Sequence, residues 1–155
     1  MKINFTKNEY GLLLEILAIA DWVMNAHSTI DRTETKKYSD LEQKLFSFAK
    51  EMRCDELILF DKEEGKYFPT KEHDEIGEHR KFIEEFEEES FWSELVSKLA
   101  TRDFLKQVTK EELEAMPYKE QMSKILELEE WYENEIYENG LDNFKIDKTV
   151  KNKMH

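Results

Sequence analysis

The sequence predicts a mainly α-helical protein, folded as a single compact domain of about six helices. Three observations lead to this fold class. The 155 residues include only four Gly and two Pro, too few for the many turns of an all-β protein. Capping motifs precede apolar residues at helical spacing in several places. Hydrophobic residues make up 39% of the chain and aromatic residues 12%, enough for a packed core despite the many charges.

Reciprocal capping pairs mark three of the expected helix starts. In such a pair the hydroxyl of Ser or Thr accepts from the amide three residues on, and the Glu side chain at that position accepts from the cap amide. Each pair precedes an apolar pattern, which strengthens the prediction of a helix. The pairs are Thr6 with Glu9, Ser39 with Glu42, and Thr109 with Glu112.

The first helix is expected over about residues 7–27. It is apolar on most of its circumference, which is typical of a central helix covered by its neighbours. Residues 28–38 are polar and aperiodic, so we expect a connection there. A second helix follows the Ser39 cap, with a core-facing stripe made of Leu41, Leu45, Phe48, Ala49 and Met52.

Residues 54–70, CDELILFDKEEGKYFPT, allow two interpretations. The apolar runs LILF and YF flank a polar loop with Gly65 near its end, which suits a small β-hairpin. Alternatively, Asp55 starts a short helical turn before an extended segment that ends at Pro69. We prefer the second interpretation, because so short a hairpin is marginal alone.

Four further helices follow. A third is expected from Asp74 to Glu88, weakened by Gly77, and Ser90 is expected to cap a fourth. A short fifth helix follows the capping pair at 109–112. Pro117 suits the first position of a sixth helix, since its missing amide hydrogen is not needed there, and Gly140 suits the end of that helix.

The two chain ends carry alternating apolar and polar residues, MKINF at 1–5 and NFKID at 143–147. This pattern allows a short two-stranded sheet that pairs the N- and C-terminal segments. The helical domain is therefore expected to span residues 1–147. Residues 148–155, KTVKNKMH, are expected to form a basic, frayed tail.

Charge and cysteine content restrict the function classes. The formal net charge is −13, which disfavours direct nucleic-acid binding, because phosphate contacts need clustered Lys and Arg. The lone Cys54 forms no internal disulfide, which favours a reducing, cytoplasmic location. No secretory signal is visible, and the apolar stretch 10–24 is too short to span a bilayer, so we expect no membrane association.

Asp21, Asn25 and His27 lie at the polar end of the first helix. Asp21 and Asn25 are four residues apart and share a face. They could hold a metal ion or act at a cleft, with Asp21 and His27 as catalytic candidates. The preferred interpretation is structural: Asp21 ties the helix to a cation such as Arg32, Arg53 or Arg80, since a buried carboxylate needs a partner.

A second polar cluster lies within KEHDEIGEHRKF. Glu75 and His79 share a helical face at a spacing that can present two ligands to one ion. The candidate metal ligands are His73, Asp74, Glu75 and His79. The sequence HExxH is absent, however, and acidic residues are common in a first helical turn, where they favour the helix dipole.

The two clusters together give an enzyme hypothesis, a metal-dependent hydrolase of a phosphohydrolase-like kind. Bound divalent ions would polarise a phosphoryl oxygen and activate water, with Asp103 as a further acidic candidate. The glycine motifs of phosphate-binding loops and the GxSxG elbow are absent. No cofactor is predicted outside this alternative.

Acidic, aromatic-bearing helix faces are the more informative surface feature. Residues 84–89 hold five Glu around Phe86, and residues 127–142 hold seven acidic residues and no Lys or Arg. Trp131, Tyr132 and Tyr137 lie within the second stretch. Because aromatic side chains anchor interfaces and an acidic surface attracts basic proteins, we prefer a non-enzymatic protein-interaction domain with a protein partner, for which the charge favours a basic protein. The alternative for these stretches is a solvated helix exterior whose aromatics point inward.

Overall fold

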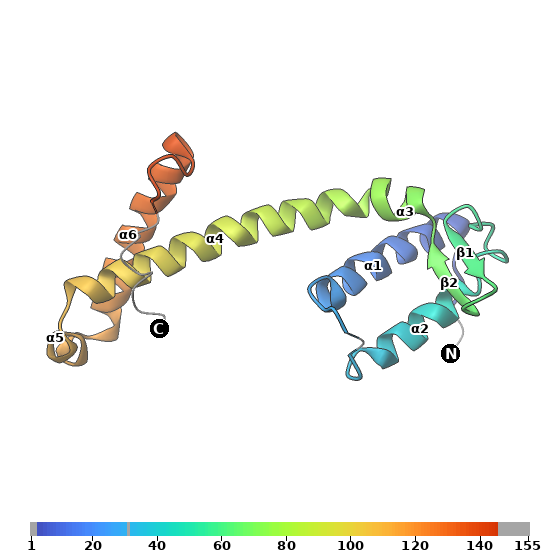
Figure 1. Ribbon diagram of the computed structural model, residues 1–155, viewed down its shortest axis with the longest axis horizontal. Helices are drawn as coiled ribbons and strands as arrows, with labels where there is room; N and C mark the ends of the chain where they lie inside the picture. The colour runs from blue at the N-terminus through green and yellow to red at the C-terminus, as the bar shows by residue number, and fades with distance from the viewer. Residues whose placement is uncertain (1–2, 31, 146–155) are drawn as a thin grey trace, which may run out of the picture. The chain divides into compact units, whose positions relative to one another are not determined.

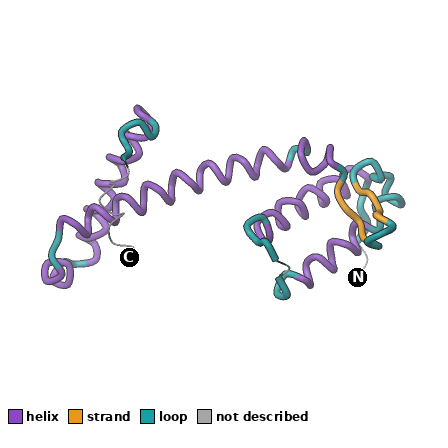
Figure 2. The backbone as a smooth tube through the Cα atoms, in the orientation of Figure 1, coloured by secondary structure: helices purple, strands orange, loops and turns teal. Residues whose placement is uncertain are grey.

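The structure, a computed structural model, describes residues 3–30 and 32–145. These residues form six α-helices and one two-stranded antiparallel hairpin (Figures 1 and 2). The prediction of a mainly α fold with six helices is therefore confirmed for the described chain. The elements are α1 (Lys7–Asn25), α2 (Lys36–Phe46), β1 (Ile58–Asp61), β2 (Lys66–Pro69), α3 (Lys71–Ile76), α4 (His79–Gln107), α5 (Lys110–Ala115) and α6 (Tyr118–Asn139).

The contacts divide the chain into two compact units, residues 1–88 and 89–155, and α4 contributes to both. The N-terminal unit holds α1, α2, the hairpin and α3 with the start of α4. The C-terminal unit holds the rest of α4 with α5 and α6. The expected limit of the domain at residue 147 and the basic tail at 148–155 lie outside the described residues and stay predictions.

In the N-terminal unit, α1 and α2 lie side by side and the hairpin closes one end of the pair (Figure 1). Tyr10 and Leu14 on α1 are almost fully buried, and the Tyr10 hydroxyl donates to the carbonyl of Leu45 at 2.7 Å. This hydrogen bond lets the phenol enter an apolar core without leaving a polar group unpaired. The buried core residues are Tyr10, Leu14, Phe46, Ala49, Cys54 and Ile58.

The sheet is the hairpin, and its position corrects two predictions. Residues 3–5 and 143–145 are not strands, while the preferred turn-and-extended interpretation of 54–70 is wrong and the hairpin alternative is right. Packing explains this outcome. The side chain of Gln43 bonds both the amide and the carbonyl of Tyr67 at 2.8 Å, and Ile58 is buried in the core, so the hairpin is not left to stand alone.

Two of the three capping pairs are confirmed. Thr6 with Glu9 and Thr109 with Glu112 form both reciprocal bonds at the starts of α1 and α5. The pair Ser39 with Glu42 does not cap a helix, because α2 already begins at Lys36. Both residues therefore lie inside α2, and the side chain of Glu42 is free to meet another element.

The predicted boundary at Ser90 is also wrong. Residues 79–107 form one continuous helix, while the expected helix from 74 is broken at Gly77, whose ψ of 149° is extended. Nothing near Ser90 opposes helix formation, since a single Ser costs little within a helix. Gly77 adopts non-helical angles easily because it lacks a Cβ. As predicted, α6 follows Pro117 and ends at Gly140.

The C-terminal unit packs α4 against α6. Its core consists of Val96, Ala100 and Tyr132, with Leu99, Ile125, Leu128, Ile136 and Phe144 packed around them. The ring of Tyr132 lies 6.2 Å from that of Phe144 and 4.8 Å from that of Trp131. One side of α6 is thereby buried, and the opposite side faces solvent.

Candidate functional site

The polar end of α1 forms an internal hydrogen bond. The side-chain amide of Asn25 donates to Asp21 Oδ1 at 2.7 Å, as the i, i+4 spacing allows. Two of the expected cationic partners of Asp21 are engaged elsewhere. Arg32 bonds the carbonyl of Met24 and the carboxylate of Glu34, and the guanidinium of Arg80 lies 4.5 Å from the ring of Trp22. Neither Arg32 nor Arg80 therefore forms the predicted tie to Asp21.

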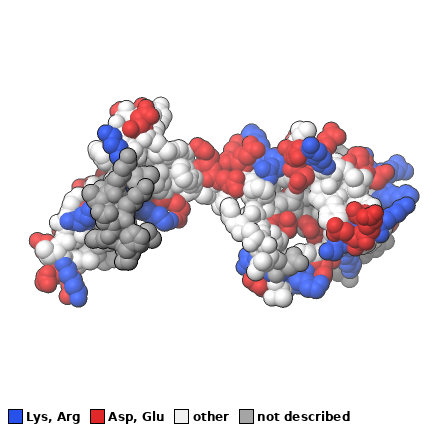
Figure 3. Space-filling view, in the orientation of Figure 1, with Lys and Arg blue, Asp and Glu red and all other residues white. Residues whose placement is uncertain are grey.

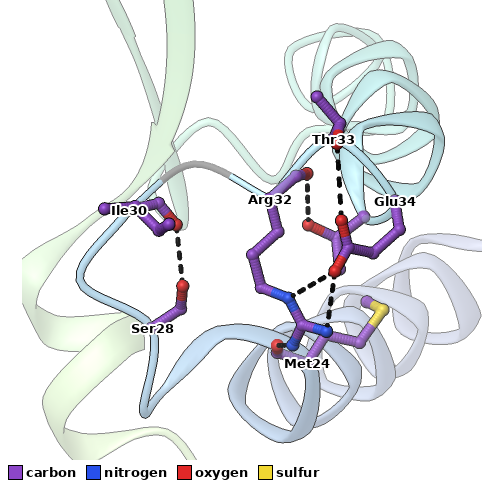
Figure 4. A network of polar contacts seen from close by, with 7 residues as sticks. Met24, Ser28, Ile30, Arg32, Thr33 and Glu34 are labelled. Carbon is purple, nitrogen blue, oxygen red and sulfur yellow. Dashed lines mark hydrogen bonds and ion pairs between the residues drawn. The ribbon is translucent and has the colours of Figure 1, made fainter.

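His27 does not join Asp21. It is exposed on the wall of a cavity of about 580 Å³ that also includes Val23, Ser28, Ile30 and Thr33. Figure 4 shows the polar network beside this cavity, in which Arg32 reaches both Met24 and Glu34. Ser28 donates to the carbonyl of Ile30 at 2.7 Å. The guanidinium is thus already bound by groups of the chain, and the network ties the end of α1 to the loop that follows.

Asp21 instead faces Glu42 across a small cavity between α1 and α2. Both carboxylates line this space of about 70 Å³, together with Leu17, Met24 and Leu41. Burial and the neighbouring Asp21 raise the pKa of Glu42 to about 7. A carboxyl group in this setting keeps its proton at mildly acidic pH, where an ordinary Glu is ionised, since desolvation and a like charge both disfavour ionisation. Sequence reasoning missed the pair because it assigned Glu42 to a helix cap.

The residues of the second cluster are separated by the break at Gly77. His73 within α3 and His79 at the start of α4 are buried, with 6% and 1% of their surface exposed, and their rings lie 5.0 Å apart. Asp74 and Glu75 are exposed, and Glu75 lies 3.7 Å from Lys71. Glu75 and His79 therefore do not share one helix, which corrects the basis of that prediction.

Burial lowers the pKa values of both imidazoles. The positive charge of the neighbouring ring lowers the pKa of His73 further, and Arg80 does the same for His79, while Asp74 opposes both shifts. Within the described residues, the buried Nδ1 of His79 has no hydrogen-bond partner. The pair is therefore neutral near pH 7. Nowhere in residues 3–30 and 32–145 do three or more His, Cys, Asp or Glu side chains gather as metal ligands would.

Asp103 belongs to a structural network in the C-terminal unit. It bonds Arg102 at 2.7 Å and Lys106 at 2.9 Å, and it accepts a short hydrogen bond from the hydroxyl of Tyr132 on α6. These donors hold the pKa of Asp103 well below its usual range. The network fastens α4 to α6 and leaves the carboxylate no free lone pair for a substrate.

The four aromatic residues predicted to mediate interaction differ in exposure. Tyr132 is buried, with 7% exposed, so it serves the core and not the surface. Phe86 is 63% exposed, Trp131 56% and Tyr137 91%. Phe86 lies among exposed glutamates of α4, where Figure 3 shows acidic side chains gathered along the helix. Three of the four thus lie on acidic helix surfaces, and two of these are on α6.

The exposed side of α6 forms a continuous surface, which we call the α6 outer face. One row along the helix holds Leu126, Glu130, Glu133 and Tyr137, and the adjacent row holds Glu127, Trp131, Asn134 and Glu138. All eight residues are exposed, and the i, i+4, i+7 spacing places each row on one line of the helix.

No helix in the described part of the chain has the length and apolar character needed to cross a membrane. No protein-family model matches the chain, and neither a curated protein nor a solved structure is detectably similar to it.

Proposed function

We propose that the protein is a non-enzymatic interaction domain that binds another protein through acidic, aromatic-bearing helix faces. The observation that carries this proposal is the α6 outer face. Trp131 and Tyr137 expose most of their surface there, although large aromatic side chains gain more from burial than other residues do. Their neighbours on the same helix are carboxylates, so a partner surface that is both apolar and cationic would be complementary.

The carboxylates of this face are not neutralised by the described part of the chain. The nearest cation along α6, Lys124, pairs with Glu120 at 3.2 Å, and Lys98 and Lys106 on α4 pair with Glu94 and Asp103. Residues 127–142 contain no Lys or Arg. A basic protein is therefore attracted to this region, which speeds its association and favours it over acidic competitors.

Site-specific photo-crosslinking in the source cells tests the proposal. A photoreactive phenylalanine analogue is placed at Trp131 or Tyr137, and, as a matched control, at Tyr118. Tyr118 is also an aromatic residue of α6 and is exposed, but it lies outside the two rows. We expect positions 131 and 137 to capture the same protein and position 118 not to capture it. Equal capture at all three positions, or none at 131 and 137, would overturn the proposal.

A further inference from the structure

The α6 outer face carries information about the chemistry of its partner, and this inference rests on the proposed function. Apolar and acidic residues are interspersed along the face instead of separating into an apolar centre and a charged rim. Leu126, Trp131 and Tyr137 are each followed or preceded on the helix surface by a glutamate. The face from 126 to 138 is about 18 Å long, at 1.5 Å per residue.

The carboxylates and the aromatic rings of this face both attract cations. Carboxylates do so by charge, and the rings of Trp131 and Tyr137 do so because the faces of aromatic rings are negative. A guanidinium or ammonium group that approaches the face meets a ring and a carboxylate within one helical turn, since positions three and four apart are neighbours. Phosphate groups of nucleic acids or of anionic lipids would be repelled by the same carboxylates.

The apolar parts of the face require more than free cations. Leu126 is exposed and has no charge to contribute, and burial of the two rings needs an apolar surface in addition to a cation. A lysine- or arginine-bearing amphipathic helix meets both needs, because it carries apolar side chains and long cationic side chains on adjacent lines. About 18 Å corresponds to roughly three turns of such a helix.

From this we infer that the α6 outer face binds a basic amphipathic helical segment of a partner protein, roughly three turns long. Apolar side chains of the segment cover Leu126 and the rings of Trp131 and Tyr137. Lys or Arg side chains pair with Glu127, Glu130, Glu133 and Glu138.

The test uses the full chain and synthetic peptides of fourteen residues, about the length of the face. One peptide alternates Leu with Lys and Arg at amphipathic helical spacing, a second has Glu at every cationic position, and a third scrambles the first so that no apolar stripe remains. Binding is measured by calorimetry at low and moderate salt. We expect the first peptide to bind, the second not to bind, and the third to bind more weakly than the first. Affinity should fall as salt rises, because exposed charges are screened.

Variants separate docking on α6 from general attraction to an acidic protein. The double variant Trp131→Ala with Tyr137→Ala should weaken binding at least about tenfold, as truncation of aromatic anchors does. Glu130→Gln with Glu133→Gln should weaken it by about threefold to tenfold, since each exposed pair contributes little. The matched control Glu63→Gln with Glu64→Gln removes two charges from the exposed hairpin turn and should leave the affinity within about twofold.

Equal losses in the α6 and hairpin variants would overturn the inference, and so would equal binding of the basic and acidic peptides. If positions 131 and 137 capture a partner in cells but the basic peptide does not bind, the partner class is wrong and the interaction stands. If the captured protein is a second copy of this chain, the basic-segment inference is likewise wrong. Absence of both capture and peptide binding refutes the proposed function together with the inference.

Discussion

Replacing Glu42 by Gln should stabilise the N-terminal unit, and the gain should depend on pH. Burial and Asp21 raise the pKa of Glu42 from its ordinary value of 4.5 to about 7. Between these two pH values the folded protein holds a proton that the unfolded chain releases. The contribution of Glu42 to stability therefore falls as pH rises through this window, and the full penalty is present above pH 7.

The size of the effect follows from the shift. At about 1.36 kcal/mol for each pH unit, the upper bound is about 3.4 kcal/mol. Glu42 is only partly buried, and water screens such a group, so we expect a gain of about 1–2.5 kcal/mol at pH 8. The gain should be small at pH 4.5, where the folded protein holds the proton and the unfolded chain is half protonated, and it should vanish at lower pH. Asp21→Asn should recover less than Glu42→Gln, because burial is the larger cause of the shift.

Urea unfolding at pH 4.5, 6, 7 and 8 measures this gain. Substituting Phe for Trp92 and Trp131 leaves Trp22 as the fluorescent reporter, and Trp22 lies on α1 of the N-terminal unit. Glu51→Gln is the control, since Glu51 is exposed, and its effect should stay within about 0.5 kcal/mol at every pH. A difference between Glu42→Gln and wild type that does not grow with pH would refute the reasoning.

Three further changes have defined outcomes. A Cβ at Gly77 would lie 2.5 Å from Cε1 of His79, so Gly77→Ala should lower the free energy of unfolding in urea by about 1–3 kcal/mol. A Cβ at Gly11 would meet nothing within 4 Å, so Gly11→Ala should raise it by about 0.5–1 kcal/mol. Similar changes in stability for the two variants would contradict this reasoning. Burial lowers the pKa of His79 below 6.5, so the contribution of this residue to stability falls on acidification below pH 6.5, by at most about 1.4 kcal/mol per pH unit. Between pH 7.5 and 5.5, His79→Phe should therefore lose less stability than the wild type, or gain more, as measured by the urea midpoint. A difference between the two proteins that stays constant across this range would exclude this role. Tyr132→Phe removes the donor to Asp103 and should lower the free energy of unfolding by about 1.5–3 kcal/mol. Circular dichroism should then show unfolding at a lower urea concentration. An unchanged unfolding midpoint would show that the hydrogen bond adds no net stability.

Capping motifs predicted helix starts well where both hydrogen bonds of the motif form within a span of four residues. Thr6 with Glu9 and Thr109 with Glu112 need no information from the rest of the chain. The pair Ser39 with Glu42 has the same spacing and fails, because residues from Lys36 onward are also competent to form a helix and the chain enters it earlier. A capping motif therefore shows where a helix can begin, while the preceding residues decide whether it does.

The presence of the hairpin and the exposure of apolar residues on α1 both depend on contacts between segments that are distant in the sequence. Gln43 pairs with Tyr67 of β2, and no pattern within 58–69 contains that support. Conversely, α1 is apolar on most of its circumference, which predicted that neighbouring helices would cover it on all sides. Leu12, Ile16 and Val23 are nevertheless exposed. Periodicity shows which residues are apolar, and only the packing of neighbours decides which of them are buried.

The sequence predicted which polar residues are unusual more successfully than it predicted which of them lie together. The sequence identified Asp21, His73 and His79 as unusual, but their partners required the fold. Glu42 meets Asp21 because α1 and α2 lie side by side, and His79 meets His73 because Gly77 turns the chain between α3 and α4. Helical spacing alone placed His79 with Glu75, which is exposed and on a different helix.

The two perturbed groups of the N-terminal unit act against each other between about pH 4.5 and 6.5. On acidification, the unfolded chain also takes up the proton at Glu42, so the destabilising contribution of this residue disappears and stability rises. Over the same range the unfolded chain protonates histidines that stay neutral when buried, so His73 and His79 lower stability. A nearly flat profile of the wild type would thus hide two opposing slopes. Glu42→Gln should therefore expose the acid sensitivity of the histidines, and His79→Phe should expose the opposite slope of the carboxyl pair. If each single variant has the same flat profile as the wild type, neither group changes its protonation on unfolding in this range.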